Sequence, residues 1–146
     1  MKTWLVLALL SMLCWGCYIV LTKVAISDKY CGLGPRWTTL LMVIGIVIVM
    51  GAYVALSKEP KPLLTPASTL VGISTGALWA LGMLFSVLAI GMGANVSRIT
   101  PIYNCNTLVA VLLGIMILKE IPDSAGVVRI IIGSLLIISG GVLVAK

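Results

Sequence analysis

Five apolar runs, each long enough to cross a lipid bilayer, leave this chain few possible folds. They cover about residues 3–22, 36–56, 67–91, 95–118 and 124–145, and short polar segments separate them. An α-helix rises ~1.5 Å per residue, so about 20 apolar residues span a hydrocarbon core of ~30 Å. Only 10% of the residues are charged, against ~25% in soluble domains. We therefore predict an all-α integral membrane protein in which residues 1–146 form a single domain of five transmembrane helices.

The charged residues lie outside the apolar runs or near their ends. All four acidic residues fall in the gaps, so no carboxylate is expected at mid-membrane: Asp28, Glu59, Glu120 and Asp123. The net charge of +6 comes from basic residues scattered singly near helix ends, where they suit lipid headgroups. This pattern disfavours nucleic acid as a partner and favours membrane lipids.

The first apolar run imitates a secretory signal peptide, with Lys2 ahead of an apolar stretch. That stretch is longer than the apolar region of a signal peptide, and no cleavage site precedes a soluble domain, so we expect it to be retained as a membrane helix. Cys14-Trp15-Gly16-Cys17 has the spacing of a redox motif but lacks its strand–helix context. We interpret the two cysteines as small packing residues.

Polar and aromatic stripes run along two of the expected helices. One is Ser11, Trp15, Tyr18 and Thr22; the other is Ser68, Gly72, Thr75, Trp79, Gly82 and Ser86. A backbone-bonded hydroxyl explains Thr22, and small-residue packing explains the glycines and serines. Trp15, Tyr18 and Trp79 lie too deep to be interfacial anchors, so a cavity lining is the alternative for them. The helix over residues 36–56 is almost wholly aliphatic, and we expect it to face lipid.

The fourth run opens with the most polar stretch expected within a span, Thr100-Pro101-Ile102-Tyr103-Asn104-Cys105-Asn106-Thr107. Helical spacing places its polar side chains on one face or beside it, and hydrocarbon offers them no hydrogen-bond partners. We expect this face to meet protein or a watery cavity. Pro101 removes the N–H that would bond the Ser97 carbonyl, so the helix either bends there or begins there with Thr100 as its N-cap. Arg98 either reaches the headgroups or attracts an anionic substrate.

The last run carries glycines every seven residues, at Gly126, Gly133 and Gly140, with Gly141 alongside. Such a repeat forms a groove for a closely packed helix. Asp123 or Ser124 is expected to cap this helix. Arg129 is expected to reach the headgroups or to pair with Asp123 or Glu120.

The basic residues give the chain no preferred orientation. With five crossings, five of them fall on each side of the membrane. A chain without such a bias can insert both ways up, and two inverted copies would supply the inverted repeats that are common in transporters.

Several short motifs together resemble the EamA-like repeat of the drug/metabolite transporter superfamily, in its single-repeat, five-helix branch. In order they are Leu13-Cys14-Trp15-Gly16 followed by Lys23, Ala89-Ile90-Gly91, Ile99-Thr100-Pro101-Ile102, Ile117-Leu118-Lys119-Glu120, and the closing pattern over residues 133–144. The resemblance covers nearly the whole chain. It implies an antiparallel homodimer in which the first, third and fourth helices line a central cavity and the second is peripheral.

The last helix also resembles the dimerising helix of the related four-helix multidrug exporters, which implies a dimer interface at Gly126, Gly133 and Gly140. Those exporters use a glutamate in their first helix, and this chain has none there. The resemblance therefore gives no support for proton-coupled export of cationic drugs.

These observations lead to the hypothesis of a small-metabolite transporter that works by alternating access. Its substrate site is expected to be uncharged, with Pro101 shaping the helix bend and with this lining: Trp15, Tyr18, Trp79, Tyr103, Asn104, Asn106 and Thr107. Small polar or aromatic solutes are the expected substrates, and uniport fits better than proton antiport. The alternative is a non-transporting membrane subunit or assembly factor whose polar stripes only pack helices.

An enzyme is disfavoured because the chain lacks histidine and shows no carboxylate pair or activated nucleophile. We predict no catalytic residue, cofactor or metal. The expected location is the inner (cell) membrane of a bacterium or archaeon, as a multi-pass protein.

Overall fold

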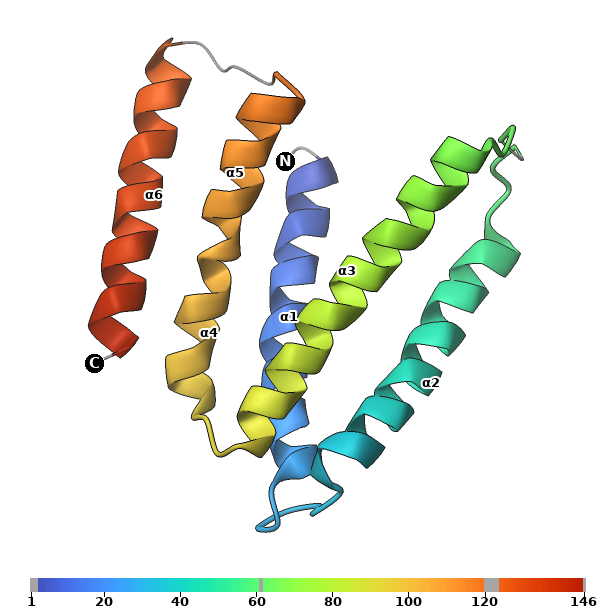
Figure 1. Cartoon of the computed structure of the whole chain (residues 1–146), viewed down its shortest axis with the longest axis vertical. Coiled ribbons are helices and arrows are strands. Elements are labelled where there is room, and N and C mark those ends of the chain that lie inside the picture. The colour runs from blue at the N-terminus through green and yellow to red at the C-terminus, as the bar shows by residue number, and fades with distance from the viewer. Residues whose placement is uncertain (1–2, 61, 120–123, 146) are drawn as a thin grey trace. The chain divides into compact units, whose positions relative to one another are not determined.

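The computed structural model describes residues 3–60, 62–119 and 124–145. All regular secondary structure in these ranges is helical: α1 (Thr3–Ile26), α2 (Gly34–Leu56), α3 (Pro66–Gly91), α4 (Val96–Asn104), α5 (Asn106–Ile117) and α6 (Ser124–Ala145) (Figure 1). Helices α4 and α5 form one interrupted span, so five segments are long and apolar enough to cross a membrane. The predicted fold class and its five spans are confirmed.

The largest boundary difference is at the end of α1, which reaches Ile26 instead of residue 22. The charge of Lys23 suggests the start of a loop, but a cation in the last turn interacts favourably with the carbonyl end of the helix dipole. The extra turn buries Ile26. The chain then folds back in a short loop, where Gly32 adopts a positive φ of 62° and donates its N–H to the Ser27 carbonyl at 3.0 Å.

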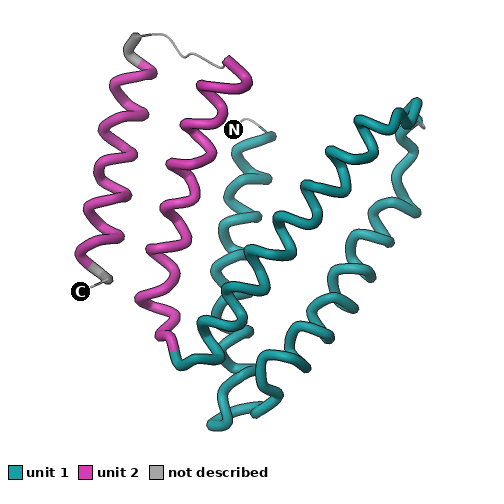
Figure 2. Tube along the Cα trace, in the orientation of Figure 1, with its two compact units in different colours: residues 1–93 teal, residues 94–146 magenta. Residues whose placement is uncertain are grey.

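The helices form two compact units, residues 1–93 and residues 94–146 (Figure 2). The first contains α1, α2 and α3, and the second contains α4, α5 and α6. The prediction of a single five-helix domain is not tested by this division and stays a prediction.

In the first unit, the best-buried side chains gather at one end of the three helices. They come from the end of α1, the start of α2 and the end of α3: Ile19, Thr22, Ile26, Thr38, Val87 and Ile90. Gly91, the last residue of α3, permits a close approach to Pro35, because a Cβ at Gly91 would overlap the Pro35 ring. The three helices are therefore anchored together at this end.

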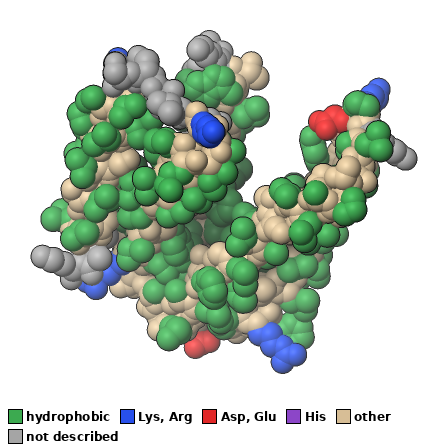
Figure 3. All heavy atoms as spheres, turned by 45° about the horizontal axis from the view of Figure 1, so that its top comes forward, with side chains coloured by type: hydrophobic (Ala, Val, Ile, Leu, Met, Phe, Trp, Pro, Cys, Tyr) green, Lys and Arg blue, Asp and Glu red, His purple; other side chains and the backbone are tan. Residues whose placement is uncertain are grey.

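Most side chains along the spans are exposed and hydrophobic, and the visible charged groups lie near helix ends (Figure 3). A soluble protein rarely exposes contiguous apolar surface on this scale. These surfaces suit contact with lipid or with further helices. The predicted cap at Asp123 or Ser124, and the pairing of Arg129 with Asp123 or Glu120, involve side chains outside the described residues.

Candidate functional site

A hollow of about 820 Å³ lies between α1, α2 and α3 in the first unit. This volume falls within the range of ~300–1,000 Å³ that is usual for small-molecule sites. Its lining is Cys14, Trp15, Cys17, Tyr18, Leu21, Thr22, Ala25, Leu33, Thr38, Leu41, Met42, Gly45, Ile46, Val49, Met50, Trp79 and Met83.

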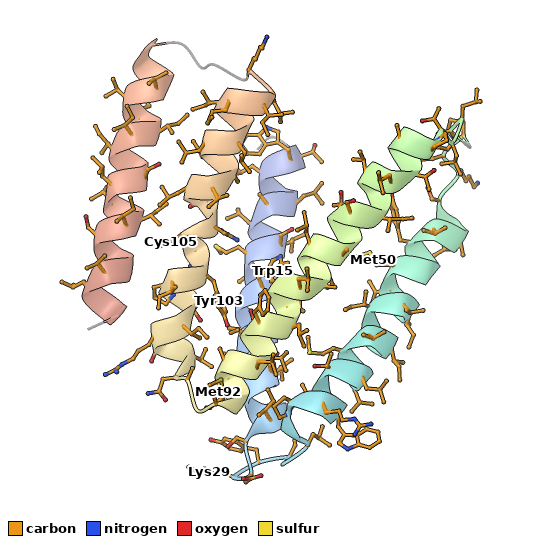
Figure 4. The ribbon with its side chains drawn as sticks, viewed as in Figure 1. Trp15, Lys29, Met50, Met92, Tyr103 and Cys105 are labelled. Carbon is orange, nitrogen blue, oxygen red and sulfur yellow. The ribbon has the colours of Figure 1, made fainter. Side chains whose placement is uncertain are left out.

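Three of the predicted site residues form an aromatic cluster in this hollow. The Trp15 ring, on α1, stands edge to face with Tyr18, with ring centroids 5.7 Å apart and an interplanar angle of 86°. Trp79 reaches Trp15 from α3, with ring centroids 6.1 Å apart and an interplanar angle of 70°. Trp15 is labelled in Figure 4. Both are preferred geometries for aromatic pairs. The structure therefore brings Trp15, Tyr18 and Trp79 together.

The two threonines in the lining already use their hydroxyl protons within their own helices. Thr22 Oγ1 donates to the Tyr18 carbonyl at 2.9 Å, and Thr38 Oγ1 donates to the Gly34 carbonyl at 2.8 Å. Both residues are buried, at 4% and 3% exposure. The backbone-bonded interpretation of Thr22 is confirmed. The hollow is thus aromatic and aliphatic in character, and its lining contains no Lys, Arg, Asp or Glu.

Helix α2 contributes one side of the hollow. Seven of its residues line it: Thr38, Leu41, Met42, Gly45, Ile46, Val49 and Met50. One face of α2 therefore lines the hollow, while Thr38 is the only buried residue of this helix; its expected outer, lipid-facing position stays a prediction. This face could not be recognised beforehand, because a helix that is aliphatic all round has no polar stripe to indicate which side meets protein.

The polar stretch of the fourth span lies across the break between α4 and α5. Helix α4 begins at Val96 and contains Pro101, so the alternative of a helix beginning at Thr100 is wrong. The interruption comes at Cys105, where the Cys105 N–H donates to the Ile102 carbonyl at 3.1 Å and the Leu108 N–H donates to the Cys105 carbonyl at 3.0 Å. Such three-residue spacing is tighter than that of an α-helix.

Several polar side chains at this break have no hydrogen-bond partner within the described part of the chain. The amides of Asn104 and Asn106 are exposed and accept or donate no hydrogen bond there, and the Tyr103 hydroxyl is buried without a partner. Thr107 Oγ1, by contrast, donates to the Asn104 carbonyl at 2.8 Å. These four residues belong to the second unit and the aromatic cluster to the first, so their meeting in one site stays a prediction.

Helix α6 packs against the break through a glycine that the sequence analysis did not single out as a contact. A Cβ at Gly141 would lie 3.1 Å from Cys105 Sγ and 3.7 Å from the Pro101 carbonyl oxygen. Its neighbour Gly140 and the earlier Gly133 have nothing within 4 Å of such a Cβ. Gly141 therefore allows close packing of α6 within the unit. The face of α6 that carries Gly133 and Gly140 is open at these two glycines. The dimer interface at Gly126, Gly133 and Gly140 stays a prediction.

A scan against protein-family models matches residues 2–145 to the EamA-like transporter family. The chain belongs to this family. Neither a curated protein nor a solved structure matches it significantly. The family match confirms the resemblance found in the sequence motifs.

As an EamA-like protein with five spans, the chain is a multi-pass integral membrane protein of the drug/metabolite transporter type. The family points to transport rather than to enzymatic chemistry. Among the residues that the structure describes, no group of three or more His, Cys, Asp or Glu side chains could hold a metal ion.

Proposed function

We propose that this EamA-like protein carries a small, uncharged polar or aromatic metabolite across the membrane by alternating access, as an antiparallel homodimer. The observation that carries the proposal is a pair of amides at the break between α4 and α5, Asn104 and Asn106, which have no hydrogen-bond partner among the residues that the structure describes. The aromatic cluster of the first unit is proposed to contact the apolar part of the solute.

The amides need partners that hydrocarbon cannot provide. Each has two N–H donors and one carbonyl acceptor, and burying such a group without hydrogen bonds costs about 1–3 kcal/mol. Broken helices at membrane depth are tolerated only beside protein or a water-filled cavity. A polar solute in a central cavity, with water replacing it when it leaves, meets both requirements.

Dimerisation supplies the second half of the cavity. The chain carries one EamA-like repeat, and transporters of several folds place two inverted repeats around a mid-membrane site. The even division of basic residues permits both orientations. Gly133 and Gly140 leave open space on α6 that a second helix can approach closely.

Uptake into proteoliposomes tests the transport proposal. Protein-dependent flux is measured for radiolabelled members of several solute classes, with wild type and with Asn104→Leu. We expect the variant to lose about tenfold or more in flux, which corresponds to one hydrogen bond to the solute, or ~1.4 kcal/mol. Ser139→Ala is the matched control, because the Ser139 hydroxyl donates to the Leu135 carbonyl of its own helix at 2.7 Å.

Equal flux in Asn104→Leu and wild type would show that Asn104 does not bind the transported solute. If no solute class enters proteoliposomes faster than protein-free liposomes, the result would contradict transport and would favour a non-transporting subunit.

Crosslinking tests the dimer. With Cys14, Cys17, Cys31 and Cys105 replaced by alanine, Gly133→Cys is expected to give a disulfide-linked dimer in lipid. Ile131→Cys is the matched control, because two residues of helix rotate it to nearly the opposite face, where it is exposed. A Gly133→Cys protein that stays monomeric at every protein-to-lipid ratio would contradict the α6 interface.

A further inference from the structure

We infer that the hollow of the first unit binds a neutral, planar aromatic ring, with Trp15 and Trp79 forming the wall that recognises it. This inference rests on the proposed transport function and narrows its solute class. Four observations carry it: the absence of charge in the lining, the internal hydrogen bonds of its two threonine hydroxyls, the edge-to-face aromatic geometry, and the sulfur-containing side chains in the rest of the wall.

The absence of charge selects against ionic solutes. The lining holds no Lys, Arg, Asp or Glu, and the acidic residues that the structure describes, Asp28 and Glu59, lie outside the spans. An anion or a zwitterion would therefore stay unpaired at membrane depth, which is unfavourable. A cation would gain contact with the aromatic faces, but such contacts are weaker than the cost of an unpaired charge in the bilayer.

The small number of polar side chains in the lining, and the internal bonding of its two threonines, select against sugars and other polyols. Thr22 and Thr38 donate to carbonyls of their own helices. The lining is otherwise dominated by Leu, Ile, Val, Met, Cys, Gly and aromatic residues. A polyol in this hollow would leave several of its own hydroxyls without partners, which is costly when they are removed from water.

The remaining surface suits a flat ring. Trp15 and Trp79 already meet at 70°, and aromatic rings prefer offset or edge-to-face partners in the same way. Sulfur from Cys17, Met42 and Met83 lines the hollow as well, and thioether sulfur makes favourable contacts with aromatic rings. A ring would thus have aromatic side chains on the α1 and α3 side and aliphatic side chains of α2 on the other. An acyl chain gains less from such a wall.

Binding of tritiated indole tests this inference. Flow dialysis with the wild type in lipid nanodiscs is compared with empty nanodiscs, so that partition into lipid is subtracted. Saturable binding is expected for the wild type. Trp79→Leu, which keeps bulk and loses the ring, is expected to weaken binding about tenfold, the size of one or two aromatic contacts. Trp79→Phe is expected to stay within about threefold. Trp4→Leu is the matched control, because Trp4 is exposed at the start of α1 and does not line the hollow.

Competition identifies what the hollow recognises. Unlabelled indole and phenol are expected to displace the probe, whereas cyclohexanol, benzoate, tetraphenylphosphonium and galactose are expected to displace it at least tenfold less well. Equal displacement by cyclohexanol would mean that any apolar group fits, an acyl chain included, and would overturn the inference. Stronger displacement by the cation or by galactose would overturn it in favour of those classes. Equal binding by Trp79→Leu and Trp79→Phe would also overturn it. Circular dichroism and gel filtration check that each variant is folded.

Failure of this inference is distinguishable from failure of the transport proposal. Protein-dependent flux of a polar solute, together with non-saturable indole binding, would overturn the inference and leave transport standing. Saturable indole binding without flux of any solute would support the ring site and contradict transport.

Discussion

The hollow of the first unit and the break in the fourth span solve the problem of polar groups in a membrane in opposite ways. In the hollow, Thr22 and Thr38 bond carbonyls of their own helices, and the surface that remains is aromatic, aliphatic and sulfur-rich. At the break, Asn104 and Asn106 have no partner within the described residues. A backbone-bonded threonine is a common membrane residue, whereas an unpartnered amide requires a further molecule or helix. The threonine hydroxyls of the first region are therefore bonded within their own helices, whereas the amides of the second need a further partner.

The largest expected effect comes from restoring the backbone at the break. Pro101→Ala returns the N–H that would bond the Ser97 carbonyl, and it removes the clash of the proline ring with the preceding turn. We expect the free energy of unfolding in mixed micelles to rise by about 1–3 kcal/mol, while flux in proteoliposomes falls at least tenfold. Pro66→Ala is the control, because Pro66 begins α3, where a missing N–H costs little. Unchanged flux in Pro101→Ala would show that the break does not serve transport.

The next effect concerns the anchored end of the hollow. Gly91→Ala places a methyl group against the ring of Pro35, and the rigid ring cannot move aside. We expect a loss of about 1–3 kcal/mol in the free energy of unfolding, as for other overpacked sites. Indole binding should weaken as well, because α2 and α3 would separate where the hollow is anchored. Gly51→Ala, at an open position of α2, should change stability by no more than ~1 kcal/mol. Equal stability of the two variants would contradict the tight junction.

These two sites show how far the sequence could predict the structure. Bilayer-length apolar runs identified five spans and most of their ends, because hydrocarbon thickness dictates helix length. The missing N–H of Pro101 predicted a bend or a break in the helix, but it could not predict that the interruption would come at Cys105. The close approaches of Gly91 to Pro35 and of Gly141 to Cys105 join residues far apart in the sequence. Only the packed structure reveals them.

The candidate site was predictable where polarity stood out and not where it was absent. Trp15, Tyr18 and Trp79 were recognisable because aromatic and polar residues are unusual inside an aliphatic span, and the structure places them together. The contribution of α2 escaped prediction because Ile46 and Val49 look the same whether they face lipid or a hollow. The pattern of hydrophobic residues separates positions that face water from positions that do not. Within a bilayer it does not separate positions that face lipid from positions that face protein, because both are apolar.

A smaller effect separates the two neighbouring glycines of α6. Gly141→Ala brings a methyl group to 3.1 Å from Cys105 Sγ, so we expect a loss of about 1 kcal/mol in the free energy of unfolding. Cys105→Ala should recover most of this loss, and a double-mutant cycle measures the coupling between the two positions. Gly140→Ala should leave monomer stability unchanged, because the position is open within the chain. It should weaken dimerisation if the proposed α6 interface is right. Equal destabilisation by both substitutions would contradict the contact between α6 and the break.

The smallest expected effect is at Thr22, and it provides the sharpest contrast with Asn104. Thr22→Val keeps the shape of the side chain and removes a hydroxyl whose proton is already used on the Tyr18 carbonyl. That carbonyl still has the backbone partner normal for an α-helix, so the substitution leaves no acceptor without a hydrogen bond. We expect flux and indole affinity to stay within twofold of wild type, and the free energy of unfolding to change by less than ~1 kcal/mol. A tenfold loss of flux would mean that Thr22 exchanges its helix bond for a bond to solute. The hollow, like the break, would then offer hydrogen bonds to the solute. The contrast between threonine hydroxyls bonded within their own helices and amides that need a further partner would not hold.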